Sequence, residues 1–284
     1  MLDIVKKYFE KEYGYSGTGI KLNNSYENSI NSYIYNDMIN PAFIHIDELF
    51  ESTVLGFLLA MFEWYKDFEN LETYKACFGY ILYLMNDVCI FEEMQNIAAN
   101  QKLMNTVNGD IHILQLAEDC YWAIVAFTLA HEIAHAYLAT IGKKYTEKHP
   151  EKEEIDADMI AYHIVLKIIE EKAANSILEE YTYLAPIMYM DFFELVYYTD
   201  RILYKTVFHD AQHPIPKKRK SRLFSIVKNK MHLYDIHTSD GNNLYNCFLD
   251  VYKEFRIQLI VKMDARKLDN ILWSEKRKHR SDND

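Results

Sequence analysis

A histidine pair and a glutamate near the middle of the 284-residue chain have the spacing of a metal site: His131, Glu132 and His135. Residues four apart in a helix leave the same face about one turn apart, so both imidazoles could reach one ion. Zinc binds histidine nitrogen at about 2.0–2.1 Å, and a catalytic zinc has three protein ligands and an open position. Glu132 would lie beside the metal and act as the general base. The motif therefore predicts a catalytic zinc site that still needs a third ligand.

The third ligand is expected at Glu154, at the start of the next helical segment. The connecting residues 143–152 are polar and long enough for the chain to reverse, so Glu154 would come from an antiparallel neighbouring helix. Asp158 lies four residues further on the same face. A carboxylate there could accept the free ring N–H of a ligand histidine, with His131 the expected partner, and fix its orientation. Asp156 should point elsewhere and be solvated.

A five-residue motif also arises by chance, and the alternative is that both histidines are core or surface residues without a metal. The flanking segments 124–130 and 136–141 are strongly apolar, and unpartnered His and Glu would be costly to bury there. A metal site is therefore favoured. A second alternative is a non-catalytic zinc-binding helical protein with an interaction or regulatory role. Structural zinc sites are usually closed by four protein ligands, which speaks against it.

The order HExxH then ExxAD resembles the gluzincin metallopeptidases, notably the HtpX and CAAX-prenyl-protease family and the Lit-like phage-exclusion peptidases. The resemblance covers residues 125–165 and 209–226 and implies one zinc ion. It implies the following roles: zinc ligands His131, His135 and Glu154, catalytic base Glu132, and histidine partner Asp158. The HP-x(4)-R segment of that family has a counterpart in the run from His213 to Arg219. HtpX-type members are embedded in membranes, whereas this chain has no convincing membrane span.

Hydrolysis of a peptide bond by zinc-activated water also needs a donor that stabilises the oxyanion. His213 is the first candidate for that donor or for a substrate contact, Arg219 is the next, and His209 is weaker. Each has a structural alternative. His213 and Arg219 could each instead pair with Glu154 or Asp158 and be structural, and either histidine could be a satisfied loop residue.

The net charge of −11 argues against non-specific nucleic-acid binding, which depends on neutralising phosphates with Lys and Arg. The four cysteines form no CxxC pair and are too few for a disulfide framework. Residues Met1–Tyr13 lack the apolar region of a secretory signal, and no uncharged apolar run is long enough to span a bilayer. We therefore expect a cytoplasmic zinc metalloendopeptidase that acts on a protein or peptide substrate.

Few glycines and prolines, eight and five, favour long helices. We expect one mainly α domain over 1–284 with a small β-sheet, in the manner of zincins, and a less regular segment at 1–46. Short strands or ordered loop are expected at Ser32–Tyr35 and Ala42–Ile46, and Ile111–Leu114 could be an edge strand that aligns an extended substrate. Apolar periodicity predicts helices over residues 2–13, 47–64, 71–89, 91–104, 117–141, 153–172, 177–181, 191–208, 220–235 and 243–262.

Overall fold

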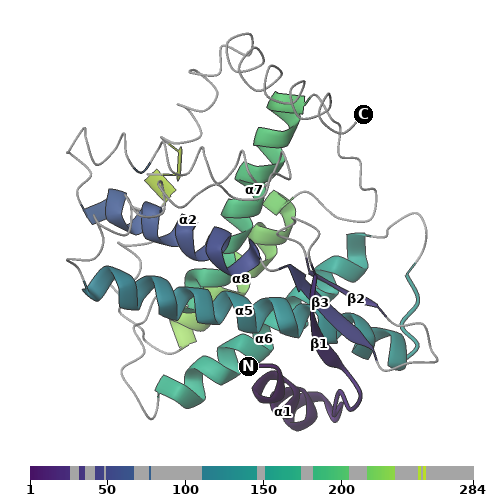
Figure 1. Cartoon of the computed structure of the whole chain (residues 1–284). Coiled ribbons are helices and arrows are strands. Elements are labelled where there is room, and N and C mark those ends of the chain that lie inside the picture. Colours follow the sequence, from purple (N-terminus) through teal and green to yellow (C-terminus); the bar gives the residue numbers. More distant parts are fainter. Residues whose placement is uncertain are drawn as a thin grey trace.

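Helices dominate the part of the chain that the structure, a computed structural model, describes (Figure 1). The described residues are 1–25, 32–35, 42–47, 49–66, 77, 111–145, 151–173, 182–204, 216–233, 249–250 and 252–253. The helices are α1 (Leu2–Tyr13), α2 (Leu49–Lys66), α5 (Ile111–Thr140), α6 (Glu151–Ala173), α7 (Ala185–Tyr204) and α8 (Pro216–Leu233), with a 3₁₀ turn at Thr182–Leu184 before α7. The expected mainly α architecture with a small sheet is confirmed.

The sheet has three short strands, β1 (Lys21–Ser25), β2 (Ser32–Tyr35) and β3 (Phe43–Asp47), in the order β1-β3-β2. The central strand β3 pairs in parallel with β1 and antiparallel with β2, where Ile34 faces Ile44. Ile44 is fully buried and ties the sheet to the core. Of the two alternatives for the segments near 32–35 and 42–46, strand or ordered loop, the structure has strands at both. Strand β2 is an edge strand that contacts α5.

Helix α5 is the central element, and it contacts α1, α2, α6, α7 and β2. Its 30 residues include no Gly or Pro, so no helix breaker interrupts it. It ends where Gly142 adopts a left-handed φ of 67° and the Lys143 N–H donates to the Leu138 carbonyl at 3.1 Å. This is the hydrogen bond of a glycine-terminated helix. Figure 1 shows α2 lying along α5, and the sheet lies near the right-hand end of α5 in this view.

The expected strand at Ile111–Leu114 is wrong, because these residues form the first turn of α5. Ile111 is 74% exposed while Ile113 is buried, so this run is the partly exposed start of a helix. A run of four residues with three apolar side chains does not distinguish a strand from a helix end by periodicity, and the helix that follows decided between them.

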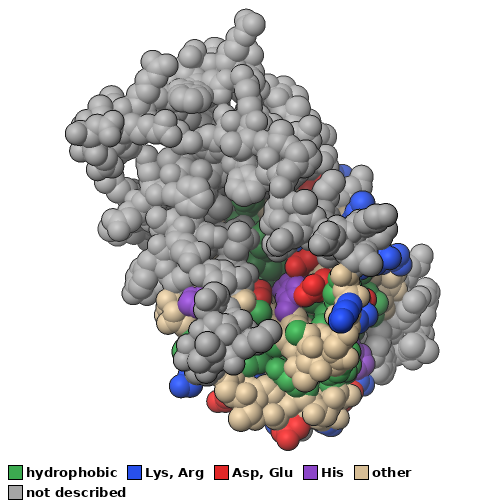
Figure 2. Space-filling view, turned by 90° about the vertical axis from the view of Figure 1, so that its right-hand side faces the viewer, with side chains coloured by type: hydrophobic (Ala, Val, Ile, Leu, Met, Phe, Trp, Pro, Cys, Tyr) green, Lys and Arg blue, Asp and Glu red, His purple; other side chains and the backbone are tan. Residues whose placement is uncertain are grey.

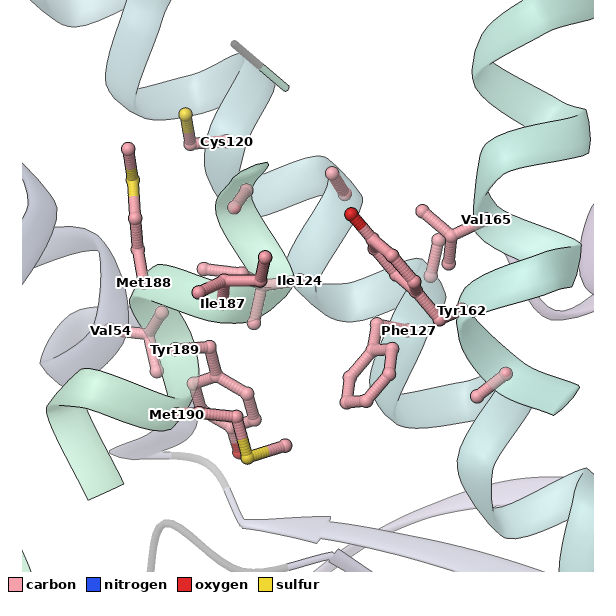
Figure 3. Packing of buried hydrophobic residues seen from close by; sticks show 14 of the residues in the cluster. Val54, Cys120, Ile124, Phe127, Tyr162, Val165, Ile187, Met188, Tyr189 and Met190 are labelled. Carbon is pink, nitrogen blue, oxygen red and sulfur yellow. The ribbon is translucent and has the colours of Figure 1, made fainter. Parts of the chain in front are cut away.

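The packing of α6 on α5 is antiparallel, as expected. His135 meets Glu154, His131 meets Asp158, and the Phe127 ring lies 6.5 Å from that of Tyr162, so partner numbers rise on α6 as they fall on α5. Figure 3 shows part of the core around these helices: Phe127 of α5 lies near Tyr162 of α6, and Met188 of α7 lies on the α5 side. The residues of the site therefore come from two helices that pack against each other through buried apolar side chains.

Most predicted helices in the described residues are confirmed, with shifted ends. Helix α7 begins at Ala185 instead of residue 191, and α8 begins at Pro216 instead of residue 220. Proline suits the first turn of a helix, because its missing N–H would have no partner there. The predicted helices at 91–104 and 177–181, and nearly all of 71–89 and 243–262, lie outside the described residues.

Among the described helices, α5 alone is long and apolar enough to cross a membrane by length and composition. Of its apolar window, 56% is buried inside the protein. The core helix of a soluble protein passes the same test, so this finding by itself does not identify a membrane span.

Candidate metal centre

His131 and His135 project from one face of α5 toward the first turns of α6. Their Nε2 atoms lie 3.1 Å apart. Glu154 faces both rings, with Oε2 at 3.4 Å from His131 Nε2 and Oε1 at 3.3 Å from His135 Nε2. The predicted triad is thus brought together by the packing of two helices. In Figure 2, histidine is visible at the surface between acidic side chains.

The donor set fits one zinc ion. Tetrahedral coordination with bonds of about 2.0–2.1 Å places neighbouring ligand atoms about 3.3–3.4 Å apart. The three distances at this site, 3.1, 3.3 and 3.4 Å, agree with that spacing. Two imidazole nitrogens and a carboxylate oxygen are also the donor types of catalytic zinc sites. The residues present therefore form a possible metal-binding triad.

Asp158 lies behind His131, where its Oδ1 is 3.0 Å from Nδ1 of the ring, as the sequence predicted. The carboxylate is almost completely buried, with 1% of its side chain exposed. Burial by itself would lower the pKa of His131, but hydrogen bonding to Asp158 and Glu154 outweighs it and raises the pKa to about 10. Asp158 therefore favours a proton on Nδ1, which leaves Nε2 to face the metal position.

Glu153 occupies the equivalent position behind His135, with Oε1 at 3.0 Å from Nδ1. No role for Glu153 is predicted from the sequence. The only sequence feature that could have indicated a role is its position, because Glu153 is an acidic residue directly before the expected ligand Glu154.

Burial would raise the pKa of Glu154, but hydrogen bonds from both histidines and the charge of Arg219 hold that pKa far below its usual range.

Arg219 reaches the same cluster from α8. Its Nε and Nη2 donate to the two oxygens of Asp158, both at 2.6 Å, and Nη1 lies 3.7 Å from Oε2 of Glu154. Burial would raise the pKa of Asp158, but the guanidinium opposite it lowers that pKa. This geometry is the pairing alternative considered for Arg219. A bidentate pair of this kind is both strong and directional.

Glu132 follows the first histidine on α5 and is 4% exposed. Tyr189 of α7 is also buried, and its ring packs between Phe50 and Phe193, with centroids at 5.8 and 4.6 Å. Burial is the main cause that raises the pKa of Tyr189, and the charge of Glu132 contributes. The expected base is therefore buried and lies near Tyr189 of α7.

Asp156 is 35% exposed, in keeping with the expected partly solvated position, but it also has two hydrogen-bond partners. It accepts hydrogen bonds from Lys143 at 2.6 Å and from Tyr145 at 2.8 Å. Both donors belong to the segment that follows α5, so Asp156 anchors the chain where it leaves that helix. Its side chain still points away from the metal-binding triad. His209 and His213, the other expected participants, lie outside the described residues.

A mainly helical fold that carries HExxH on its central helix and a carboxylate on the next is typical of a metallopeptidase-type protein. The family model of Peptidase U49 matches residues 64–232, more than half of the chain, and the chain belongs to this family. The match spans the triad and Arg219. A search of curated proteins and a search of solved structures found no match. Membership of a peptidase family implies a protein or peptide substrate.

Proposed function

We propose that this chain is a zinc-dependent metallopeptidase with a gluzincin-type site, which hydrolyses a peptide bond in a protein or peptide. The observation that carries the proposal is the convergence of His131, His135 and Glu154 at the spacing of one tetrahedral ion. Membership of the Peptidase U49 family supports the reaction class. The position of Glu132 between the two histidines on α5 supplies the base.

The triad would hold the ion, and the residues around it would prepare the reaction. A bound zinc ion supplies Lewis-acid polarisation of the scissile carbonyl and makes water acidic enough to attack near neutral pH. Glu132 takes a proton from the attacking water and delivers it to the leaving amine. Its buried position excludes bulk water from that transfer. Asp158 keeps His131 in the orientation that ligation requires.

The oxyanion still needs a donor, and His213 is the first candidate, with His209 next. Arg219 is weaker in this role because its guanidinium already contacts Asp158 and Glu154.

An extended substrate would be aligned by β2, the sheet edge that contacts α5, in place of the strand expected at 111–114. We place the reaction in the cytoplasm, because four cysteines in a chain of 284 residues are too few for the disulfide framework of a secreted protein.

The experiment compares the wild-type protein with Glu132→Gln, both loaded with zinc. Each is incubated with a cell lysate, and newly formed protein N-termini are labelled and identified. We expect Glu132→Gln to retain zinc and to lose about a hundredfold to ten-thousandfold of the cleavage rate, the usual contribution of a general base. Glu118→Gln is the matched control, because Glu118 is exposed on the same helix. Equal cleavage by Glu132→Gln and wild type would exclude the proposed mechanism.

A further inference from the structure

Each of the two histidines has a carboxylate against Nδ1, but the two carboxylates lie in different surroundings. Asp158 is buried and bound by Arg219. Glu153 has 42% of its side chain exposed, and among the described residues its ion-pair partner is His135 alone. Both Nδ1–O distances are 3.0 Å. The two contacts have the same length, but the groups that surround the two carboxylates differ.

We propose that Glu153 is a positioning residue of the metal centre, which holds His135 with Nε2 toward the ion as Asp158 holds His131. The inference rests on the proposed function in one respect, namely that the triad binds zinc. A carboxylate on the far nitrogen fixes the tautomer and ring orientation of a ligand histidine and increases its basicity. In the structure, Nδ1 of His135 already makes that contact while Nε2 faces Glu154.

The first turn of α6 explains how one segment can supply both a ligand and an orienting group. Consecutive helix residues point about 100° apart, so Glu154 faces the Nε2 atoms while Glu153 reaches around His135 to Nδ1. Two adjacent carboxylates repel each other. They lie in the first turn of α6, where the partial positive charge of the helix N-terminus stabilises acidic side chains. Both groups therefore move with one short piece of backbone.

The difference in surroundings sets the expected size of the effect. No described Lys or Arg pairs with Glu153, so its charge acts on His135 without a neutralising guanidinium. Water competes for the exposed carboxylate, which weakens its hold on the ring. Loss of such an orienting partner typically lowers metal affinity tenfold to a hundredfold. For Glu153 we expect the lower end, about tenfold.

The test measures the affinity of metal-free protein for Zn²⁺ by competition with a chelating indicator. Glu153→Gln removes the charge, and Glu153→Asp keeps the charge but shortens the reach to Nδ1. Both variants should bind zinc about tenfold more weakly than wild type. Glu151→Gln, which removes the same charge two residues earlier in the same turn, should stay within about twofold. All metal-free variants should unfold at nearly the same temperature.

A second readout is the visible absorption spectrum of the Co²⁺-loaded proteins, which reports coordination geometry. We expect both Glu153 variants to shift this spectrum and Glu151→Gln to leave it unchanged. Wild-type affinity and an unchanged spectrum in the Glu153 variants would overturn the inference, even if cleavage depends on Glu132. Weakened zinc binding in those variants, together with undiminished cleavage by Glu132→Gln, would instead leave the inference standing and remove the proposed function.

Discussion

Replacing Arg219 with leucine should destabilise the protein through the carboxylate that it leaves behind. Asp158 is 1% exposed, and Arg219, with 13% of its side chain exposed, donates to both of its oxygens at 2.6 Å. Removing one partner of a buried ion pair costs about 3–5 kcal/mol, because the remaining charge stays desolvated. His131 remains against Asp158 and compensates in part, so we expect about 3 kcal/mol in metal-free protein.

Chemical denaturation followed by circular dichroism, with chelator present, measures this free energy of unfolding. In a chain of this size a loss of about 3 kcal/mol also lowers the melting temperature by roughly 6 °C. Arg219→Lys keeps the charge but not the planar fork, so it should cost about 1–2 kcal/mol. Arg222→Leu is the matched control: it makes the same substitution on the exposed face of α8 and should change stability by less than about 0.5 kcal/mol.

A double variant isolates the pair itself. The double variant with Arg219→Leu and Asp158→Asn removes both charges. Its loss of unfolding free energy should be smaller than the sum of the losses in the two single variants by about 1–3 kcal/mol. Strict additivity of the two losses, or wild-type stability of Arg219→Leu, would refute the view that a buried bidentate pair fastens α8 to the metal centre.

Further predictions concern pH, the core and the metal. The folded-state pKa values of Glu154 and Asp158 lie below their ordinary values of 4.5 and 3.8, so their stabilisation is complete above these values and is lost as the pH falls through and below them. The pKa of His131 is raised from 6.5 to about 10, so its contribution is complete below pH 6.5 and is lost toward pH 10. Urea unfolding of metal-free protein from pH 3 to 10 checks both, and a flat profile would contradict them. Phe127→Ala should cost about 3–5 kcal/mol of unfolding free energy, because it opens a cavity between α5 and α6, whereas Phe127→Leu should cost much less. Removal of zinc by a chelator should lower the melting temperature, and added zinc at a hundred times its dissociation constant should restore about 2.7 kcal/mol; calorimetry that shows no change on either step would speak against a metal-stabilised fold.

Much of the centre could be predicted because its geometry is local. The i, i+4 spacing of His131 and His135 defines one face of any helix that contains them, and the apolar flanks make that helix certain to be buried. Glu154 follows after a connection short enough to place the next helix alongside. The short strands at Ser32–Tyr35 and near Ala42–Ile46 were likewise bounded by turn-forming residues.

Other features depended on contacts that no local pattern encodes. Residues 111–114 carry three apolar side chains and one histidine, a pattern that suits a strand as well as a helix, and their continuity with α5 decided the outcome. Asp156 is partly solvated, as expected, but the path of the chain after Gly142 also brings Lys143 and Tyr145 to it. The position of the loop that carries these donors depends on where α6 lies. The sequence of the loop does not specify the position of α6.

The sequence by itself determined the donor types, the face of α5 on which the histidines lie and the presence of acidic residues at the start of α6. Tertiary structure decided which acid meets which ring nitrogen, with Glu154 at both Nε2 atoms, Asp158 behind His131 and Glu153 behind His135. The physical reason is that these pairings depend on how α6 is rotated about its own axis. That rotation is fixed by side chains packed between the helices and by α8, and neither is encoded in the five residues of the motif.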